Sequence, residues 1–188
     1  MKGYKMKVLV TGATGFVGRK LVSELIKRKH KVSILTRDIE SARKRLPMNC
    51  EFYKWEPELY PPSSQALDCV NAVVHLAGEN IADGRWSKAR KNKIKDSRVL
   101  STRNLVSTLK SMKKPPNTFV SASAVGFYGK NKPVELYEDL GPGKDFLADV
   151  CKEWEHEAFA AMDHNIRTIA LRIGIVLGYE GGAIKKML

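Results

Sequence analysis

Three glycines near the N-terminus have the spacing of a phosphate-binding turn. Gly12, Gly15 and Gly18 form a G-x-x-G-x-x-G pattern, which follows the apolar run Met6–Thr11 and precedes the amphipathic segment Phe16–Lys29. The first glycine permits a sharp turn, the second lets the backbone approach a pyrophosphate, and the third lets helix and strand pack closely. Because a helix start carries unpaired N–H groups and a partial positive charge, we expect this turn to bind the phosphates of a dinucleotide.

The end of the next predicted strand, Val32–Leu35, indicates which dinucleotide is bound. Proteins that bind NAD usually place a carboxylate here, against the ribose 2′-hydroxyl. This sequence instead has the neutral Thr36 and then Arg37, whose guanidinium suits a 2′-phosphate unless it is a plain surface cation. Asp38 could still serve the ribose if the register shifts by a residue or two. The sequence therefore predicts NADP(H) as cofactor rather than NAD.

Strand-like and helix-like segments alternate along the chain, as they do where helices cover a parallel sheet. The expected strands are Met6–Thr11, Val32–Leu35, Glu51–Trp55, Val70–Leu76, Thr118–Ala122 and Thr168–Arg172, and the expected helices are Phe16–Lys29, Trp86–Met112 and Asp145–Met162. We expect Gly126–Lys144 to be a loop, since it is rich in glycine, proline and charge. The prediction is an α/β protein: a Rossmann-type doubly wound parallel sheet with helices on both faces, forming one domain over residues 1–188.

Composition narrows the class of protein. The 188 residues are 43% hydrophobic and carry a net charge of +13. We expect no signal peptide and no membrane span, and three cysteines without metal-ligand spacing favour free thiols in a cytoplasmic setting. The basic charge is scattered and no nucleic-acid motif accompanies it. A small, phosphate-bearing ligand is therefore favoured over nucleic acid as the partner.

Four motifs resemble the extended and atypical short-chain dehydrogenase/reductase superfamily, the NAD-dependent epimerase/dehydratase group. They are Thr11–Gly18, His75–Gly78, Val120–Ala124 and Leu171–Gly178. The resemblance implies that the second motif lies beside the adenosine half of the cofactor and the fourth near the nicotinamide. It also implies that the third motif carries the catalytic hydroxyl. Ser123 is the candidate, Ser121 competes with it, and either serine could instead satisfy backbone groups at the strand end.

A narrower resemblance is to the epimerase family proteins called short-chain dehydrogenase family 39U. It is carried by Ala77–Ile81, Trp86, Ser97–Arg98, Ser121–Val125, Asp145–Ala148 and Trp154–Glu155. Members of that subfamily run on beyond the length of this chain, so the resemblance implies a truncated form without the C-terminal part that binds substrate.

Together, the glycine turn and the resemblance give an expected set of cofactor-binding residues. They are Gly12, Thr14, Gly15, Phe16, Val17, Gly18, Thr36, Arg37, Leu76, Ala77, Gly78, Glu79, Lys93, Arg98, Ala122 and Val176. Lys93 and Arg98 lie on a long basic helix and could equally form a solvated face. His75, in a buried strand, is expected to be a core histidine rather than a base.

The superfamily's proton-transfer pair, Y-x-x-x-K, is missing from the expected helix. One alignment places Leu147 and Cys151 at the two positions, and a shift of one residue places Phe146 and Val150 there. None of these side chains can do the work of the tyrosine and lysine.

A literal Y-x-x-x-K does occur at Tyr128 and Lys132, but in an expected loop, where the spacing fixes no geometry. The sequence therefore supports two functions. One is an NADP(H)-binding oxidoreductase or epimerase-like protein with an unknown small-molecule substrate. The other is a non-catalytic NADP(H)-binding sensor or regulatory protein. The oligomeric state is open.

Overall fold

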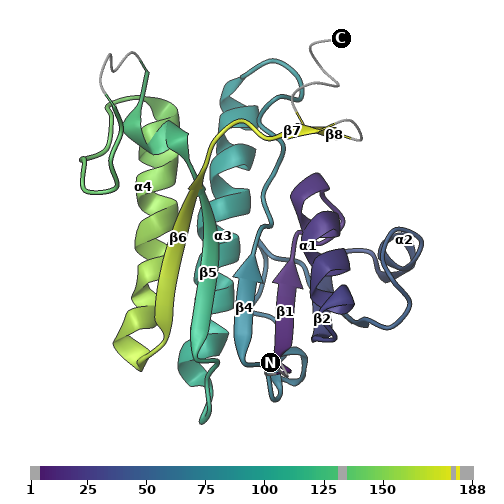
Figure 1. The fold of residues 1–188 in the computed structure, drawn as a ribbon. Helices are drawn as coiled ribbons and strands as arrows, with labels where there is room; N and C mark the ends of the chain where they lie inside the picture. The colour runs from purple at the N-terminus through teal and green to yellow at the C-terminus, as the bar shows by residue number, and fades with distance from the viewer. Residues whose placement is uncertain (1–4, 131–134, 179–180, 183–188) are drawn as a thin grey trace.

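Six parallel strands form a single twisted sheet in the computed structural model, which describes residues 5–130, 135–178 and 181–182 (Figure 1). The strand order is β3-β2-β1-β4-β5-β6, so the chain crosses over between its third and fourth strands. The strands are β1 Lys7–Thr11, β2 Lys31–Thr36, β3 Glu51–Lys54, β4 Ala72–His75, β5 Thr118–Ala124 and β6 Arg167–Ile173. The predicted doubly wound Rossmann-type sheet is confirmed. Its β1–β4 switch point is where such sheets bind ligands.

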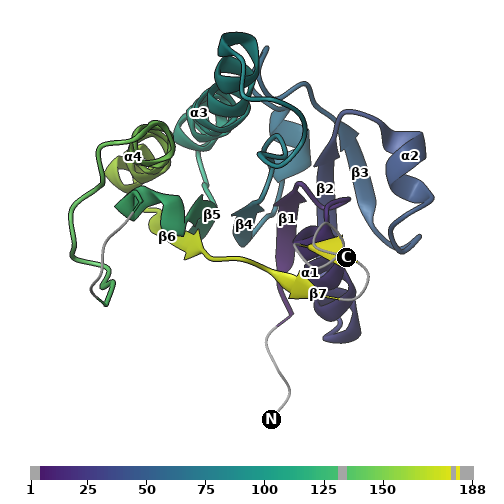
Figure 2. The ribbon, with the colours of Figure 1, turned by 90° about the horizontal axis from the view of Figure 1, so that it is seen from above.

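Helices lie on both faces of this sheet. They are α1 Phe16–Lys27, α2 Ile39–Arg43, α3 Lys88–Ser111 and α4 Phe146–Phe159, with 3₁₀ turns at η1 Ser64–Leu67, η2 Val125–Tyr128 and η3 Ala160–His164. Seen from above, α3 and α4 pack side by side on one face and α1 lies on the other (Figure 2). The side chains of Ser87 and Asp145 accept hydrogen bonds from the first turns of α3 and α4, so each long helix begins at a polar cap.

Most element boundaries differ from the predicted ones by one to three residues, and four differences bear on the architecture. The long basic helix begins at Lys88 rather than Trp86, because Ser87 caps it. The fourth strand is Ala72–His75, shorter than the predicted Val70–Leu76. The segment predicted as loop from Gly126 begins within a 3₁₀ turn, and the short helix α2 is an addition to the predicted elements. Strand ends and single-turn helices depend on local caps, which periodicity does not reveal.

The larger core lies between the sheet and the pair α3–α4. Phe119, Leu105 and Leu109 are fully buried there, with Trp55 closing the end near β3. A second core lies under α1, where Val22 packs against the strands. Burial of these side chains on both faces of β1 and β2 is the main force holding the site-bearing half of the sheet in place.

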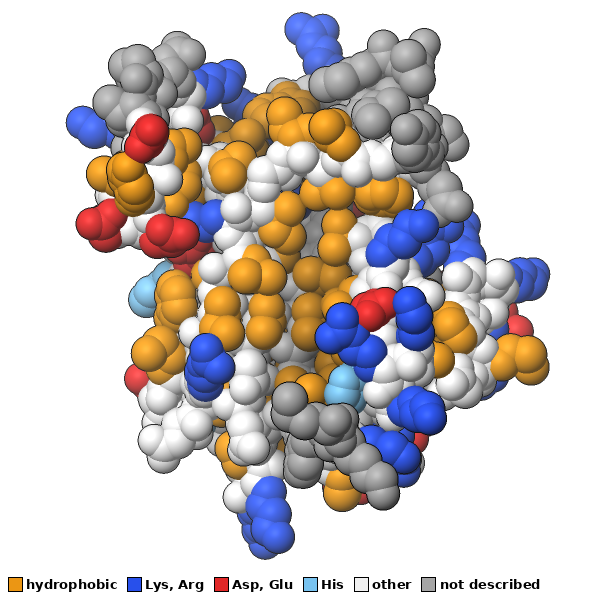
Figure 3. Space-filling view, in the orientation of Figure 1, with side chains coloured by type: hydrophobic (Ala, Val, Ile, Leu, Met, Phe, Trp, Pro, Cys, Tyr) orange, Lys and Arg blue, Asp and Glu red, His pale blue; other side chains and the backbone are white. Residues whose placement is uncertain are grey.

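Among the described residues, no helix covers the α1 side of β4, β5 and β6 (Figure 1), and hydrophobic side chains gather on this face (Figure 3). Leu171 on β6 is 44% exposed and Ile175, just beyond it, is 74% exposed. The chain then leaves β6 and crosses toward α1, where β7 Leu177–Gly178 and β8 Gly181–Gly182 pair and pack against the Phe16 ring. Apolar side chains of the sheet therefore form part of the molecular surface on this side.

Within the described ranges, no helix is both long and apolar enough to cross a bilayer. All three cysteines, Cys50, Cys69 and Cys151, are free thiols, as the sequence predicted.

Candidate functional site

The glycine turn brings the ends of β1 and β4 into backbone contact. Gly12 has a positive φ of 66°, and a Cβ placed there would lie 2.5 Å from the carbonyl carbon of Leu76 and 2.7 Å from the nitrogen of Ala77. A Cβ at Gly18 would lie 2.7 Å from the Cα of Ala13 and closer still to the Gly12 oxygen. Only glycine fits at these two positions, which explains the first and third glycines of the pattern.

The second glycine leaves the start of α1 open. Gly15 is the N-cap residue of the helix and has no side chain to accept a hydrogen bond from the first-turn amides. The first turn contains no acidic residue. The amide of Gly15 donates to the Gly12 oxygen at 3.1 Å, which fixes the turn. The first amides of α1 have no partner within the helix, and together with the helix dipole they form a site for an anion such as a pyrophosphate.

A cleft runs from this turn across the carboxyl ends of β1, β2 and β4. Its lining is Thr11, Gly12, Ala13, Thr14, Gly15, Ile34, Leu35, Thr36, Arg37, Trp55, Pro57, Glu58, Leu76, Ala77, Gly78, Glu79 and Ser97. Of the expected cofactor residues, nine lie on this lining: Gly12, Thr14, Gly15, Thr36, Arg37, Leu76, Ala77, Gly78 and Glu79. Trp55, Pro57, Glu58 and Ser97 were not anticipated, although the first three follow β3, whose end lies next to that of β2.

The remaining expected residues lie off this lining. Phe16 packs against the β7–β8 pair, Val17 is exposed on α1, Gly18 is buried against the turn, Ala122 is buried in β5 and Val176 precedes β7. Lys93 is exposed on α3, and Arg98 lies behind the cleft wall.

At the end of β2 the structure separates the roles of two neighbouring residues. Asp38 caps α2, because its Oδ1 accepts a hydrogen bond from the Ser41 amide at 2.9 Å, and it does not line the cleft. Thr36 Oγ1 bonds to the Asp38 backbone and holds the strand end in place. Arg37 is exposed and lines the cleft. The Asp38 carboxylate is thus engaged in the helix cap, whereas Arg37 belongs to the cleft lining.

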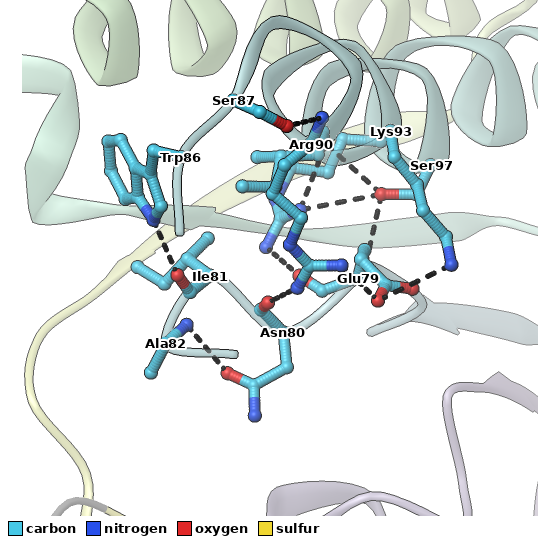
Figure 4. Close-up of polar contacts among 11 residues, drawn as sticks. Glu79, Asn80, Ile81, Ala82, Trp86, Ser87, Arg90, Lys93 and Ser97 are labelled. Carbon is cyan, nitrogen blue, oxygen red and sulfur yellow. Dashed lines mark hydrogen bonds and ion pairs between the residues drawn. The ribbon is translucent and has the colours of Figure 1, made fainter. Parts of the chain in front are cut away.

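Helix α3 holds Glu79 in the opposite wall of the cleft (Figure 4). The Glu79 Oε1 accepts from Arg90 Nη1 at 2.6 Å and lies 3.7 Å from Lys93 Nζ. The Glu79 amide donates to Ser97 Oγ at 3.0 Å, and its carbonyl accepts from Arg98 Nη2 at 2.9 Å. The hydrogen bond from Arg90, with the nearby cations Lys93, Arg90 and Arg37, lowers the pKa of the Glu79 carboxyl. Glu79 is therefore a fixed negative charge in the cleft wall.

A buried histidine ties β1, β4 and α3 together behind the cleft. His75 Nδ1 lies 2.6 Å from Thr11 Oγ1 and its Nε2 lies 3.2 Å from Ser101 Oγ. Thr11 Oγ1 accepts from the Ala77 amide and Ser101 Oγ donates to the Ser97 carbonyl, so the hydrogen-bond pattern requires the proton on His75 Nε2. Complete burial lowers the pKa of His75 to about 3. The prediction of a core histidine is confirmed.

The candidate catalytic serine belongs to a buried polar network. Ser123 Oγ donates to Glu155 Oε1 at 2.6 Å, and Glu155 is held by Arg172 through bonds of 2.9 and 3.0 Å. Arg172 also donates to the Tyr128 hydroxyl at 2.8 Å, and its guanidinium lies 3.5 Å from the centre of the Phe127 ring. The bonds to Glu155 raise the pKa of Arg172. The single hydroxyl proton of Ser123 is thus engaged by Glu155.

Leu147 and Cys151, which one alignment from the sequence places at the positions of the proton-transfer pair, bring an apolar side chain and a thiol to this end of α4. Both Leu147 and Cys151 face the turn after β5, since both lie within 4 Å of a Cβ placed at Gly126. Burial raises the pKa of the Cys151 thiol. The alternative literal pair cannot be placed, because Lys132 lies outside the described residues, while Tyr128 is buried against Arg172.

Comparison with protein families agrees with this geometry. The NAD dependent epimerase/dehydratase family model matches residues 8–187, nearly the whole chain. The chain belongs to this family. Its cleft lies where open α/β sheets of this kind bind their ligands, at the carboxyl ends of the strands beside the switch point.

Curated proteins and solved structures give the same family. The chain is 38% identical over 192 residues to an Arabidopsis thaliana protein called epimerase family protein SDR39U1 homolog, chloroplastic, matching 100% of this chain and 54% of that protein. A crystal structure of human epimerase family protein SDR39U1 (isoform2) with NADPH has a TM-score of 0.78 at 30% identity, covering 97% of this chain and 58% of that one.

The crystal structure of a nucleoside-diphosphate sugar epimerase from Corynebacterium glutamicum has a TM-score of 0.79 at 35% identity, and the match covers 98% of this chain and 37% of that one.

The chain spans somewhat more than half the length of the curated relatives that it matches.

Replacing Gly12 with alanine tests the backbone contact at the turn. We expect Gly12→Ala to lower the free energy of unfolding by about 2–4 kcal/mol, because it adds a Cβ to a left-handed backbone and drives it into Leu76. Thermal or denaturant unfolding measures this. Gly141→Ala is the matched control, since among the described residues no atom outside its two chain neighbours lies within 4 Å of its Cβ position. Equal stability of the two variants would contradict the contact.

Removing Glu155 tests the buried network. Glu155→Ala leaves the Arg172 guanidinium without its carboxylate, and we expect a loss of about 3–5 kcal/mol in unfolding free energy. Glu153→Ala, two residues away on α4, removes an exposed pair with Lys95, and its effect should stay within about 1 kcal/mol. Denaturant titration compares the two, and a Glu155 variant as stable as the Glu153 variant would argue against the network.

Stability should fall as the pH is lowered, because His75 stays neutral in the fold. Its pKa drops from 6.5 to about 3 on burial, so the unfolded chain binds the extra proton between these values. Protonation of His75 in the unfolded chain does not affect the free energy of unfolding well above pH 6.5. Below pH 6.5 it lowers the free energy of unfolding, by at most about 1.4 kcal/mol per pH unit. Unfolding titrations between about pH 7 and pH 5 should show a shallower slope for His75→Gln. An unchanged slope would mean that His75 is not the group responsible.

Proposed function

We propose that the chain binds NADP(H) and is an oxidoreductase or epimerase-like protein of the short-chain dehydrogenase/reductase type, acting on a small molecule. The observation that carries the proposal is at the end of β2: Arg37 lines the cleft, while the neighbouring carboxylate of Asp38 caps α2. A guanidinium at this place suits a 2′-phosphate, and the Asp38 carboxylate, which could have bound a 2′-hydroxyl, is engaged by the Ser41 amide. The crystal structure of the human relative with NADPH supports NADP(H) as the cofactor.

The residues of the cleft fit a dinucleotide. The open start of α1 beyond Gly15 would hold the pyrophosphate, Arg37 the 2′-phosphate, and the Leu76–Ala77 backbone would flank the adenosine. The turn gives a ligand close access to the backbone, because Gly12 and Gly15 carry no side chains. A bound nicotinamide would supply hydride exchange with a carbonyl or alcohol.

A specific observation favours a second candidate, a non-catalytic NADP(H)-binding sensor or regulatory protein. Leu147 and Cys151 stand at the positions of the family's proton-transfer pair, and the Ser123 proton is engaged by Glu155. Leu147 carries no proton to transfer, and burial raises the pKa of the Cys151 thiol, so this pair lacks the lysine-activated tyrosine of the family. This candidate keeps every group that supports cofactor binding and requires no substrate.

One experiment separates the two candidates. The protein is loaded with NADPH and mixed with a panel of aldehydes, ketones and nucleotide sugars, and NADPH fluorescence is followed over time. A fluorescence decay that depends on one of these compounds, or conversion of a nucleotide sugar to its epimer without net loss of cofactor, supports an enzyme. Cofactor that stays bound while none of the compounds is converted supports the sensor. The same compounds mixed with NADPH alone are the control.

Replacing Arg37 tests the choice of cofactor. We expect Arg37→Ala to weaken NADPH binding by about tenfold to a hundredfold, the scale of a lost hydrogen bond between charged groups, with little change for NADH. Fluorescence titration with each nucleotide gives both affinities. Arg43→Ala is the matched control, because Arg43 lies on α2 against the Phe52 ring and does not line the cleft. Equal losses for NADPH and NADH would defeat the assignment to NADP(H).

A further inference from the structure

The cleft proposed to bind an anionic cofactor contains a fixed negative charge. Two carboxylates line it, those of Glu58 and Glu79, and only Glu79 is anchored by ion pairs among the described residues. Its side chain is 20% exposed. An acid at this place opposes the binding of a phosphate, so its presence requires an explanation other than cofactor affinity.

Helix α3 gives Glu79 little freedom to move out of the cleft wall. The Glu79 carboxylate accepts a hydrogen bond from Arg90 (Figure 4). The Glu79 amide donates to Ser97, and the Glu79 carbonyl accepts from Arg98. The Arg98 side chain also packs closely against the preceding residue, Gly78, since a Cβ placed at Gly78 would lie 3.3 Å from the Arg98 guanidinium carbon. The backbone bonds fix the position of the residue, and the ion pair with Arg90 holds its carboxylate in the cleft wall.

Glu79 lines the same cleft as the cation expected to contact the 2′-phosphate. Arg37 is exposed, and its positive charge is one of those that lower the pKa of the Glu79 carboxyl. A 2′-phosphate adds nearly two negative charges at the Arg37 end of the cleft, and the negative charge of Glu79 repels it. NAD(H) lacks this group and is not subject to the same repulsion.

We propose that Glu79 is a specificity-determining residue, whose fixed negative charge limits the preference of the cleft for NADP(H) over NAD(H). The inference rests on the proposed cofactor function and concerns its selectivity. The balance between Arg37 and Glu79 would set how strongly the protein distinguishes the two nucleotides, with Arg37 favouring the 2′-phosphate and Glu79 opposing it.

Two substitutions separate charge from shape. Glu79→Gln removes the charge but keeps the length and an oxygen that can accept from Arg90, whereas Glu79→Asp keeps the charge but shortens the side chain. We expect Glu79→Gln to bind NADPH about threefold more tightly or better, the scale of one screened charge, with NADH affinity nearly unchanged. Glu79→Asp should keep the wild-type ratio. Fluorescence titrations give the dissociation constants of both variants and of the wild type for each nucleotide.

Salt dependence gives a second readout that a purely structural role would not move. The NADPH gain of Glu79→Gln should shrink as ionic strength rises, since screening weakens the repulsion that the substitution removes. Glu153→Gln is the matched control. It neutralises an acid that is also paired with a lysine of α3, but does not line the cleft, and it should leave both affinities unchanged.

Two results would overturn the proposal. One is a wild-type ratio of NADPH to NADH affinity in Glu79→Gln, whether both affinities change equally or neither changes. The other is an altered ratio in Glu79→Asp that matches that of Glu79→Gln. In each of these cases the wild-type protein still binds NADPH and the proposed function stands. A wild-type protein that bound neither nucleotide would instead remove the proposed function, and this inference with it.

Discussion

The contact between the backbone of Gly12 and the end of β4 is the constraint on which the site depends. There is no room for a side chain between Gly12 and the Leu76–Ala77 peptide. This contact brings the ends of β1 and β4 together at the switch point, where the Thr11–His75 hydrogen bond holds them from behind. The start of α1 and the residues after β4 then face the same cleft. The network of buried hydrogen bonds behind the turn makes this arrangement rigid before any ligand arrives.

The sequence predicted the parts of the structure that follow from strong local signals. The G-x-x-G-x-x-G pattern located the turn, apolar runs located the six strands, and the succession of elements indicated the sheet. These signals are reliable because each reflects a steric or burial requirement that few residue types meet. The assignment of His75 to the core followed from its place within a buried strand.

Other features could not be predicted, because they depend on contacts between distant segments. From the sequence, Asp38 is an alternative ribose ligand, and only the start of α2 shows that its side chain is a helix cap. The pairing of Ser123 with Glu155 joins residues 32 positions apart, and that of Arg98 with the Glu79 carbonyl joins residues 19 apart. No periodicity marks such pairs, since a polar residue looks the same in sequence whether its partner is protein, ligand or water.

The last strand of the sheet has a consequence for how the protein behaves in solution. Strand β6 pairs with β5 on one side, and in the described part of the chain no strand adjoins it on the other, so one row of its amides and carbonyls is open. Its outward face carries the half-exposed Leu171, with the more exposed Ile175 just beyond it. An open strand edge beside an apolar face is a template for strand addition by another polypeptide, and Arg167 is the exposed cation of this strand, since Arg172 is paired with Glu155. Concentrated, high-salt conditions would screen the Arg167 charge and favour self-association through this edge.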